Sequence, residues 1–355
     1  MSQNKQKISV CIITKNEEEN IRKCLTCLKP YPFELIVVDT GSTDGTRKVA
    51  EELADRVYDF TWINDFSAAR NFATSKAKND WILVVDSDEF LEVVDLEELY
   101  VHMEAYPSSV GSIIQKNQLR PNDTTQFYRA RINRLYNKYY YKFAGAIHEQ
   151  LIPTGNHEPS LFLTSLTVYH TGYALLEEEN RNKDIRNRDL LLQAIKDNPD
   201  EPYNYLQLAR TYDCLGEYEK ALAYYQQGFD FEIDPRRGYM NYMLVSYGNC
   251  LLTTGHYEEA LGFESFYDTF SNTGDFVFLM GRIYLANKQP LKALMQFIKA
   301  TSMSEYSQDG VTSYLAYYYI GLIYESVGNT ELALTFLKKC GDYKPALDVL
   351  AQLDS

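Results

Sequence analysis

The sequence predicts an α/β domain with a mostly parallel sheet, followed by an all-α solenoid of helical repeats. Three observations lead to this prediction. A strand–loop–helix order occurs twice near the N-terminus, which implies a parallel sheet with right-handed crossovers. The apolar run Trp81–Val85 ends in several carboxylates, as strands do at a ligand-binding sheet edge. From Leu175 onward, strand patterns vanish and helical spacing of apolar residues takes over.

The N-terminal half alternates short apolar runs with amphipathic segments. The first strand is predicted at Ile8–Ile13 and the first helix at Asn20–Leu28; a second pair follows at Leu35–Val38 and Arg47–Ala54. Pro30 ends the first helix. Further elements are predicted at Val57–Tyr58 (strand), Phe66–Ala77 (helix), Trp81–Val85 (strand), Asp95–Tyr106 (helix), Ser112–Gln115 (strand) and Ala130–Tyr136 (strand).

An acidic D-x-D-E segment, Asp86–Glu89, directly follows the strand at Trp81–Val85. In extended geometry the side chains of Asp86 and Asp88 share one side. Two hard oxygen ligands at a strand end suit Mg²⁺ or Mn²⁺, ions that usually arrive with substrate phosphates. Taken alone, the pattern is more often a solvated acidic turn.

Composition limits the classes of function. A length of 355 residues suggests two domains, and the net charge of −14 argues against wide contact with nucleic acid or an anionic membrane. No apolar run approaches the ~18–20 residues of a membrane span, and Met1–Lys7 lacks a signal-peptide core. We therefore expect a cytoplasmic protein. The six cysteines are scattered and form no disulfide framework.

Four segments in order carry a resemblance: Thr-Lys-Asn-Glu-Glu (14–18), Val-Val-Asp-Thr-Gly-Ser-Thr-Asp-Gly-Thr (37–46), Ala-Arg-Asn (69–71) and Asp-Ser-Asp-Glu (86–89). Together they resemble family 2 glycosyltransferases of the GT-A fold, a Rossmann-like domain with a mostly parallel sheet. The resemblance implies a nucleotide-sugar donor, with UDP as the family default. It also implies a divalent metal, Mn²⁺ or Mg²⁺, and inversion at the anomeric carbon.

The resemblance assigns nucleotide-sugar-binding roles to residues at strand ends. Asp39 would contact the base, Thr14 would line the base pocket, and Glu17 offers a further carboxylate. Arg70 would reach the acidic cluster or the diphosphate, with a surface salt bridge as the alternative. Asp86 would meet the ribose or a metal-bound water.

Asp88 would be the direct metal ligand, and Asp86 belongs to the same metal-binding segment. The later segment 169–173, Tyr-His-Thr-Gly-Tyr, resembles the H-x-G-Y that closes this domain in related enzymes with helical repeats. A late histidine completes the metal site in some GT-A enzymes, so His170 is the third metal candidate. A hydrogen-bonded, partly buried histidine is the alternative interpretation of His170.

A G-x-I-H-E segment, Gly145–Glu149, also recurs in family members with helical repeats. Inversion needs a general base that faces the acceptor. Glu149 is the candidate base and His148 the alternative, while a salt-bridged carboxylate is the structural interpretation of Glu149. The Glu-Asp pair that holds the base in better-studied members has no plain counterpart here.

The C-terminal half contains a repeated motif. Its copies start at Gly216, Gly255, Lys288 and Gly328, and each is preceded by a helix with small and aromatic residues. The period is near the ~34 residues of tetratricopeptide repeats, with a capping helix expected at 342–353. Four such repeats form a curved solenoid whose concave surface holds peptides or another protomer.

These observations predict a GT-A domain at residues 1–173 and a tetratricopeptide solenoid at 174–355. The expected activity is metal-dependent, inverting transfer of a sugar to an unidentified acceptor. In one alternative the acceptor is a peptide or protein, S- or O-glycosylated as by the similar peptide glycosyltransferases of glycocin bacteriocins, in which the repeats serve peptide docking or homodimerisation. In the alternative from another class, the chain is a repeat scaffold that binds nucleotide without transferring a sugar.

Overall fold

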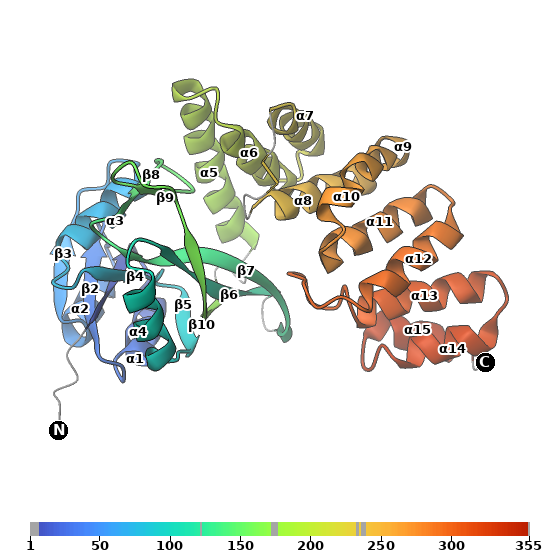
Figure 1. Cartoon of the computed structure of the whole chain (residues 1–355), viewed down its shortest axis with the longest axis horizontal. Helices are drawn as coiled ribbons and strands as arrows, with labels where there is room; N and C mark the ends of the chain where they lie inside the picture. The colour runs from blue at the N-terminus through green and yellow to red at the C-terminus, as the bar shows by residue number, and fades with distance from the viewer. Residues whose placement is uncertain (1–6, 121–122, 172–176, 232–233, 236–238, 354–355) are drawn as a thin grey trace. The chain divides into compact units, whose positions relative to one another are not determined.

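The computed structural model describes residues 7–120, 123–171, 177–231, 234–235 and 239–353 (Figure 1). By its internal contacts the chain divides into two compact units, Met1–Asp197 and Asn198–Ser355. The boundary expected at residues 173 and 174, and the last two residues of the predicted H-x-G-Y segment, lie outside the described residues. That boundary therefore stays a prediction.

The first unit is built on one eight-stranded sheet with the order β3-β2-β1-β4-β7-β6-β10-β5. Strands β3, β2, β1 and β4 run parallel, whereas β7 is antiparallel to both β4 and β6. This confirms the predicted α/β class with a mostly parallel sheet. The strands are β1 (Ile8–Thr14), β2 (Phe33–Asp39), β3 (Arg56–Asp59), β4 (Trp81–Val84), β5 (Glu89–Val93), β6 (Val110–Arg120), β7 (Asp123–Asn137) and β10 (Leu161–His170).

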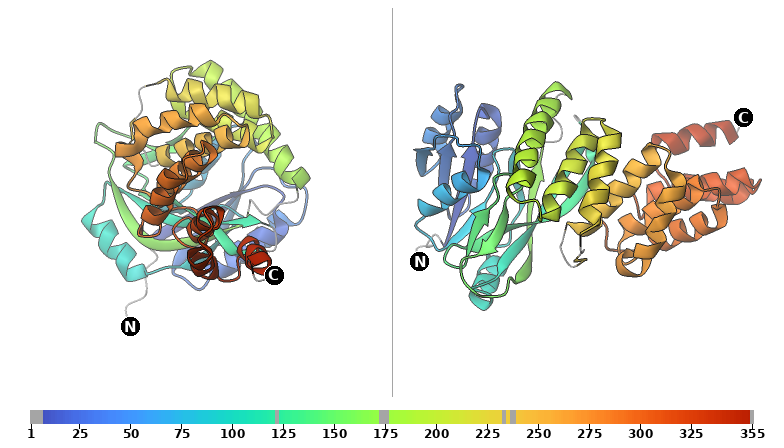
Figure 2. Two further views of the ribbon diagram at one scale, coloured as in Figure 1. Left: turned by 90° about the vertical axis from the view of Figure 1, so that its right-hand side faces the viewer. Right: turned by 90° about the horizontal axis from the view of Figure 1, so that it is seen from above.

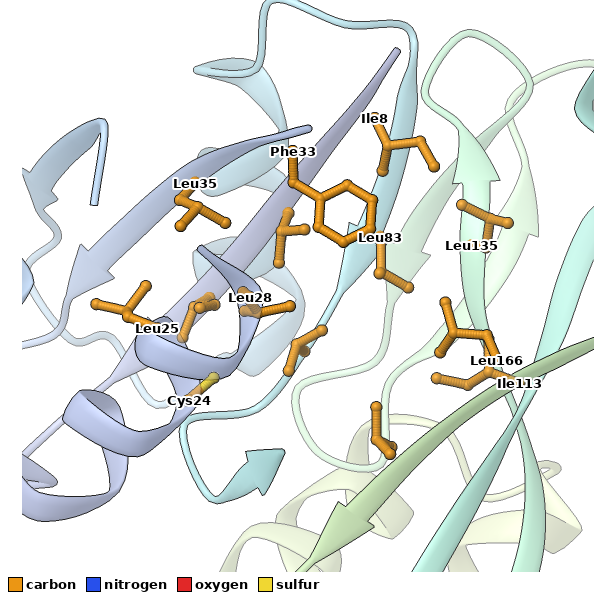
Figure 3. Close-up of a cluster of buried hydrophobic side chains, with 14 of the residues drawn as sticks. Ile8, Cys24, Leu25, Leu28, Phe33, Leu35, Leu83, Ile113, Leu135 and Leu166 are labelled. Atoms are coloured by element: carbon orange, nitrogen blue, oxygen red, sulfur yellow. The ribbon is translucent and has the colours of Figure 1, made fainter. Parts of the chain in front are cut away.

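Apolar side chains project from both faces of the central strands. Val10 of β1 enters the cluster formed with α1 and α2, whereas its neighbour Cys11 enters a second cluster that includes Ala73 of α3. Figure 3 shows Leu25 and Leu28 of the first cluster close to the strand residues Phe33 and Leu35. The elements that cover the sheet are α1 (Glu18–Leu28), α2 (Thr46–Leu53), α3 (Phe66–Ser75), α4 (Leu96–Ala105) and the hairpin β8 (Tyr141–Ala144) with β9 (Gln150–Pro153).

Helix α5 (Glu177–Asp197) is grouped with the first unit. Its Arg186 guanidinium lies 5.6 Å from the ring centroid of Phe66, at the start of α3. In the part of the chain that the structure describes, no helix combines the length and the apolar character that crossing a membrane requires.

The second unit is an array of antiparallel helix pairs that follow one another in chain order (Figure 2). The second helix of the second repeat is broken into α9, η1 and α10, a break that helical periodicity did not predict. The array confirms the predicted solenoid. Its elements are α6 (Pro202–Cys214), α7 (Tyr218–Phe229), α8 (Met240–Thr253), α9 (Tyr257–Ala260), η1 (Leu261–Phe266), α10 (Tyr267–Phe270), α11 (Gly274–Ala286), α12 (Pro290–Ala300), α13 (Tyr314–Ser326), α14 (Thr330–Lys338) and α15 (Lys344–Leu353).

The four repeated motifs begin with the same backbone turn. Its first residue adopts a positive φ, of 74° at Gly216, 80° at Gly255, 57° at Lys288 and 77° at Gly328. In every copy the next N–H donates, over 2.9 Å, to the carbonyl five residues earlier. This bond satisfies an orphan carbonyl at the helix end, as in a Schellman motif. Three repeats use glycine for this conformation, and one uses lysine.

Candidate active site

Two loops at the carboxyl edge of the sheet are joined by hydrogen bonds. Asn16, at a positive φ of 55°, accepts the N–H of Thr43 with its side-chain oxygen over 2.7 Å. The Asn16 N–H donates to the Ser42 hydroxyl over 2.9 Å, and the Glu17 N–H donates to the Thr46 hydroxyl over 2.7 Å. The loop after β1 and the loop after β2 therefore form one frame.

Asp39 and Thr14 are register partners at the ends of β2 and β1. Asp39 is 4% exposed, and its Oδ1 accepts the N–H groups of Gly41 and Ser42 over 2.8 and 2.7 Å. The buried Oδ2 of Asp39 and Oγ1 of Thr14 have no hydrogen-bond partner among the described residues. Because an unpaired buried polar atom costs about 1–3 kcal/mol, this pair of atoms is suited to a ligand that supplies the missing hydrogen bonds.

Glu17 lies at the start of α1, close to the same edge. Its Oε2 accepts the Asn20 amide over 2.7 Å. Burial raises the pKa of Glu17, and Lys183 of α5 is near enough to oppose that rise. Glu17 therefore lies at the carboxyl edge of the sheet, within electrostatic reach of α5.

Both oxygens of Asp86 are bound by arginines. Arg70 of α3 donates to Oδ1 over 2.7 Å, and Arg134 of β7 donates to Oδ2 over 2.8 Å. Burial alone would raise the pKa of Asp86, but the two guanidinium groups hold it well below its usual range. Sequence reasoning missed Arg134. The pairing of Leu135 with Leu83 sets Arg134 beside the end of β4, and a single sequence carries no local signal for this long-range register.

The candidate base Glu149 joins the same cluster. Its carboxylate accepts the Nε–H of Arg70, and its side chain is 10% exposed. The loop before it turns at Gly145, with a φ of 101°, and the Ala146 carbonyl accepts the Phe66 N–H over 2.9 Å. His148 is the neighbouring residue and has a φ of 50°. The structure thus brings Glu149, Arg70 and Asp86 together.

Glu89 braces the turn that follows β4. It is fully buried, its Oε2 accepts the Asp86 N–H over 2.8 Å, and its Oε1 accepts the Gln115 amide. Burial, followed by the charge of Asp86, raises the pKa of Glu89. A carboxyl so enclosed holds the backbone of the acidic turn and is not placed to face an acceptor.

Asp88 and His170 form a second pair at this edge. The Nε2 of His170 lies 3.2 Å from Oδ2 of Asp88, and its Nδ1 lies 2.7 Å from Oδ1 of Asn117. The described residues contain no group of three or more His, Cys, Asp or Glu side chains placed to hold a metal ion. A pair still fits Mg²⁺ or Mn²⁺, because such ions are commonly held by one or two protein ligands together with substrate phosphates and water.

Comparisons with known proteins bear on the two parts of the chain. Residues 9–159 match the model of Glycosyl transferase family 2, while residues 190–223 and 314–347 match tetratricopeptide repeat models. A TPR repeat-containing protein of Synechococcus elongatus is 30% identical over 62% of this chain and 56% of its own length. The SPbeta prophage-derived glycosyltransferase SunS of Bacillus subtilis is 28% identical over 63% of this chain and 53% of its own length.

A further relative, an uncharacterized glycosyltransferase of Rickettsia bellii, is 36% identical over 40% of this chain and 50% of its own length. The chain spans about half the length of the curated relatives that it matches. The family match covers Asp39, Arg70, the acidic turn and Glu149, and it ends before His170.

Proposed function

We propose that this chain, whose residues 9–159 form a family 2 glycosyltransferase domain, transfers a sugar from a nucleotide-sugar to an acceptor with inversion. The observation that carries the proposal is the pair of unpartnered buried atoms, Asp39 Oδ2 and Thr14 Oγ1, beside the acidic turn. A pyrimidine base presents N–H and C=O groups that match such atoms. We therefore propose a UDP-sugar as donor, with Glu17 at the edge of the nucleotide site.

The metal in this proposal is Mn²⁺ or Mg²⁺, held by Asp88 and His170 together with the donor phosphates. When bound, the ion would act as a Lewis acid for the departing nucleoside diphosphate. Asp86 was predicted both as a ligand and as a ribose contact. Because Arg70 and Arg134 occupy its two oxygens, we assign it the task of orienting these arginines beside the diphosphate.

Inversion requires a single displacement. The acceptor forms a bond to the anomeric carbon while the bond from that carbon to the phosphate oxygen breaks, and the acceptor proton moves to a base. Glu149 takes this role in our proposal, with His148 as the alternative. The Arg70 contact keeps the carboxylate of Glu149 fixed in place.

The second unit favours a peptide or a protein as the acceptor. The first helices of successive repeats contact one another through polar and aromatic side chains. Arg210 lies 5.3 Å from the ring of Tyr242, and Arg282 donates to Asn249. In a tetratricopeptide solenoid this inner row is the surface that binds extended peptides. A second copy of the chain is the other partner that such a surface would fit.

A hydrolysis screen tests the proposal. The full chain is incubated with a panel of nucleotide-sugars and Mn²⁺, and the released nucleoside diphosphate is measured with and without excess EDTA. We expect slow, EDTA-sensitive release from one donor class, and loss of release in Asp88→Ala. Saturable donor binding without release under any condition would instead indicate the nucleotide-binding scaffold and would refute the transferase.

A further inference from the structure

Asn117 lies where three strands meet behind the acidic turn. It is 4% exposed on β6, and it is the register partner of His170 on the parallel strand β10 and of Tyr128 on the antiparallel strand β7. Its sequence neighbours gave no reason to assign it a role. The pairing of β6 with β10 places its side chain beside the imidazole of His170.

The contacts of Asn117 decide which end of its amide faces the histidine. Its Nδ2 donates to the Tyr128 carbonyl over 3.3 Å and approaches the Gln115 carbonyl at 3.5 Å. Both neighbours accept hydrogen bonds only, so the nitrogen must face them and the oxygen must face His170. An oxygen acceptor 2.7 Å from Nδ1 requires the proton on Nδ1.

The other ring nitrogen of the neutral histidine then presents a lone pair. That Nε2 lies 3.2 Å from Oδ2 of Asp88. In the neutral, Nδ1–H form of the ring two electron-rich atoms therefore face one another, and either a second proton on Nε2 or a cation beside both atoms makes the contact favourable. The backbone of Asp88 is itself held, because its carbonyl accepts the Thr171 N–H over 3.2 Å. Two adjacent ligands of an octahedral ion bound at ~2.1 Å lie ~3 Å apart, close to the observed separation.

We infer that Asn117 is a positioning residue that fixes the tautomer and orientation of His170 for a divalent cation shared with Asp88. This inference rests on the proposed function, since it concerns the metal of the same site. It also gives the two aspartates different roles: Asp88 would bind the cation, whereas Asp86 binds Arg70 and Arg134. Outer partners of this kind typically change metal affinity by ~10–100-fold when they are removed.

Direct titration with Mn²⁺ tests the role of Asn117 without reference to sugar transfer. Free Mn²⁺ is followed by electron paramagnetic resonance in the presence of UDP, for the full-length wild type, Asn117→Ala, Asn117→Asp and Gln118→Ala. Gln118 is the matched control, because it is the next residue of β6, is equally buried and loses a 2.8 Å bond to Tyr169.

We expect the dissociation constant for Mn²⁺ to rise ~10–100-fold in Asn117→Ala. In Asn117→Asp, which keeps an acceptor for Nδ1–H, it should stay within about threefold of the wild type. Gln118→Ala should bind as the wild type does, with a similar loss of thermal stability. Equal affinity in Asn117→Ala and the wild type would overturn the inference and leave the transferase proposal standing.

A second measurement needs no change at Asn117. Nitrogen-15 NMR of histidine-labelled, metal-free protein at about pH 8.5, where an ordinary imidazole is neutral, reports which ring nitrogen carries the proton. The His170 signals are assigned by comparison with His170→Gln. We expect the Nδ1–H form, and the Nε2–H form would overturn the inference. A wild type that binds no Mn²⁺ would overturn it together with the metal site, while donor hydrolysis in the screen would still report on transfer.

Discussion

Replacing Lys288 with glycine should stabilise the helical array. Lys288 is exposed and has a φ of 57°, in a turn that the other three repeats build with glycine. A non-glycine residue in this left-handed region costs about 1–2 kcal/mol. Glycine also gives the unfolded chain more conformational freedom, and this lowers the stabilisation by about 0.4–1 kcal/mol. The net gain is therefore about 1 kcal/mol in the free energy of unfolding.

The two units can be followed with different probes. Both tryptophans, Trp62 and Trp81, lie in the first unit, so their fluorescence reports the α/β domain, while circular dichroism at the helical minimum is weighted to the repeats. For a domain of 150–250 residues, 1 kcal/mol shifts the melting temperature by about 2–4 °C. Lys288→Gly should raise the dichroism transition by that amount and leave the fluorescence transition in place.

The reverse change provides the matched control. At Gly328, with a φ of 77°, an added Cβ would meet no atom within 4 Å, so Gly328→Lys probes the backbone conformation alone. It should lower the same transition by a similar amount. An unchanged or lowered transition in Lys288→Gly would refute the argument that the left-handed turn at this position costs free energy.

Three further predictions concern the first unit. Glu149→Gln should reduce turnover by ~10²–10⁴ with nearly unchanged donor affinity, and His148→Ala, measured in the same steady-state assay, identifies the base if it has the larger effect. Asp88→Ala should abolish transfer while calorimetry shows a change in stability within ~1 kcal/mol, and full activity in that variant would contradict the metal assignment. Glu34, buried beside Arg56, has a pKa lowered against the effect of burial by bonds from Ser9, the Lys78 N–H and Arg56. Because the folded pKa is the lower one, Glu34 stabilises the fold above the unfolded value of about 4.3, and its advantage over Glu34→Gln should shrink in urea titrations as the pH falls from that value through the folded pKa.

The sequence predicted the parts of the fold that depend on local patterns. The apolar runs that become β1, β2 and β4 are buried on both faces, and the acidic turn follows the last of them as expected. Arg134 and Asn117 lay beyond prediction because their roles depend on how β6 and β7 pair with distant strands. An arginine and an asparagine in alternating strands look like solvated side chains until that register is known.

Burial decided other cases that sequence spacing left open. Glu89 belongs to the same acidic segment as Asp86 and Asp88, yet it is fully enclosed. Arg70 was expected either in the acidic cluster or at the surface, and its 6% exposure places it in the cluster. The general base and the metal ligands remain predictions. Their roles are defined by contact with a bound acceptor and a bound metal ion, which kinetic and binding experiments test.

The position of helix α5 determines where the repeat array can be replaced by another one. Its Arg186 lies against Phe66 of α3 within the first unit, yet the first repeat match begins at residue 190, in the same helix. A single helix therefore carries both the end of one module and the start of the next. A chimera joined at residue 174 would replace Arg186, the cation beside Phe66, together with the repeats. Grafts that keep α5 intact and cross over after Asp197 should preserve the candidate active site, whatever array follows.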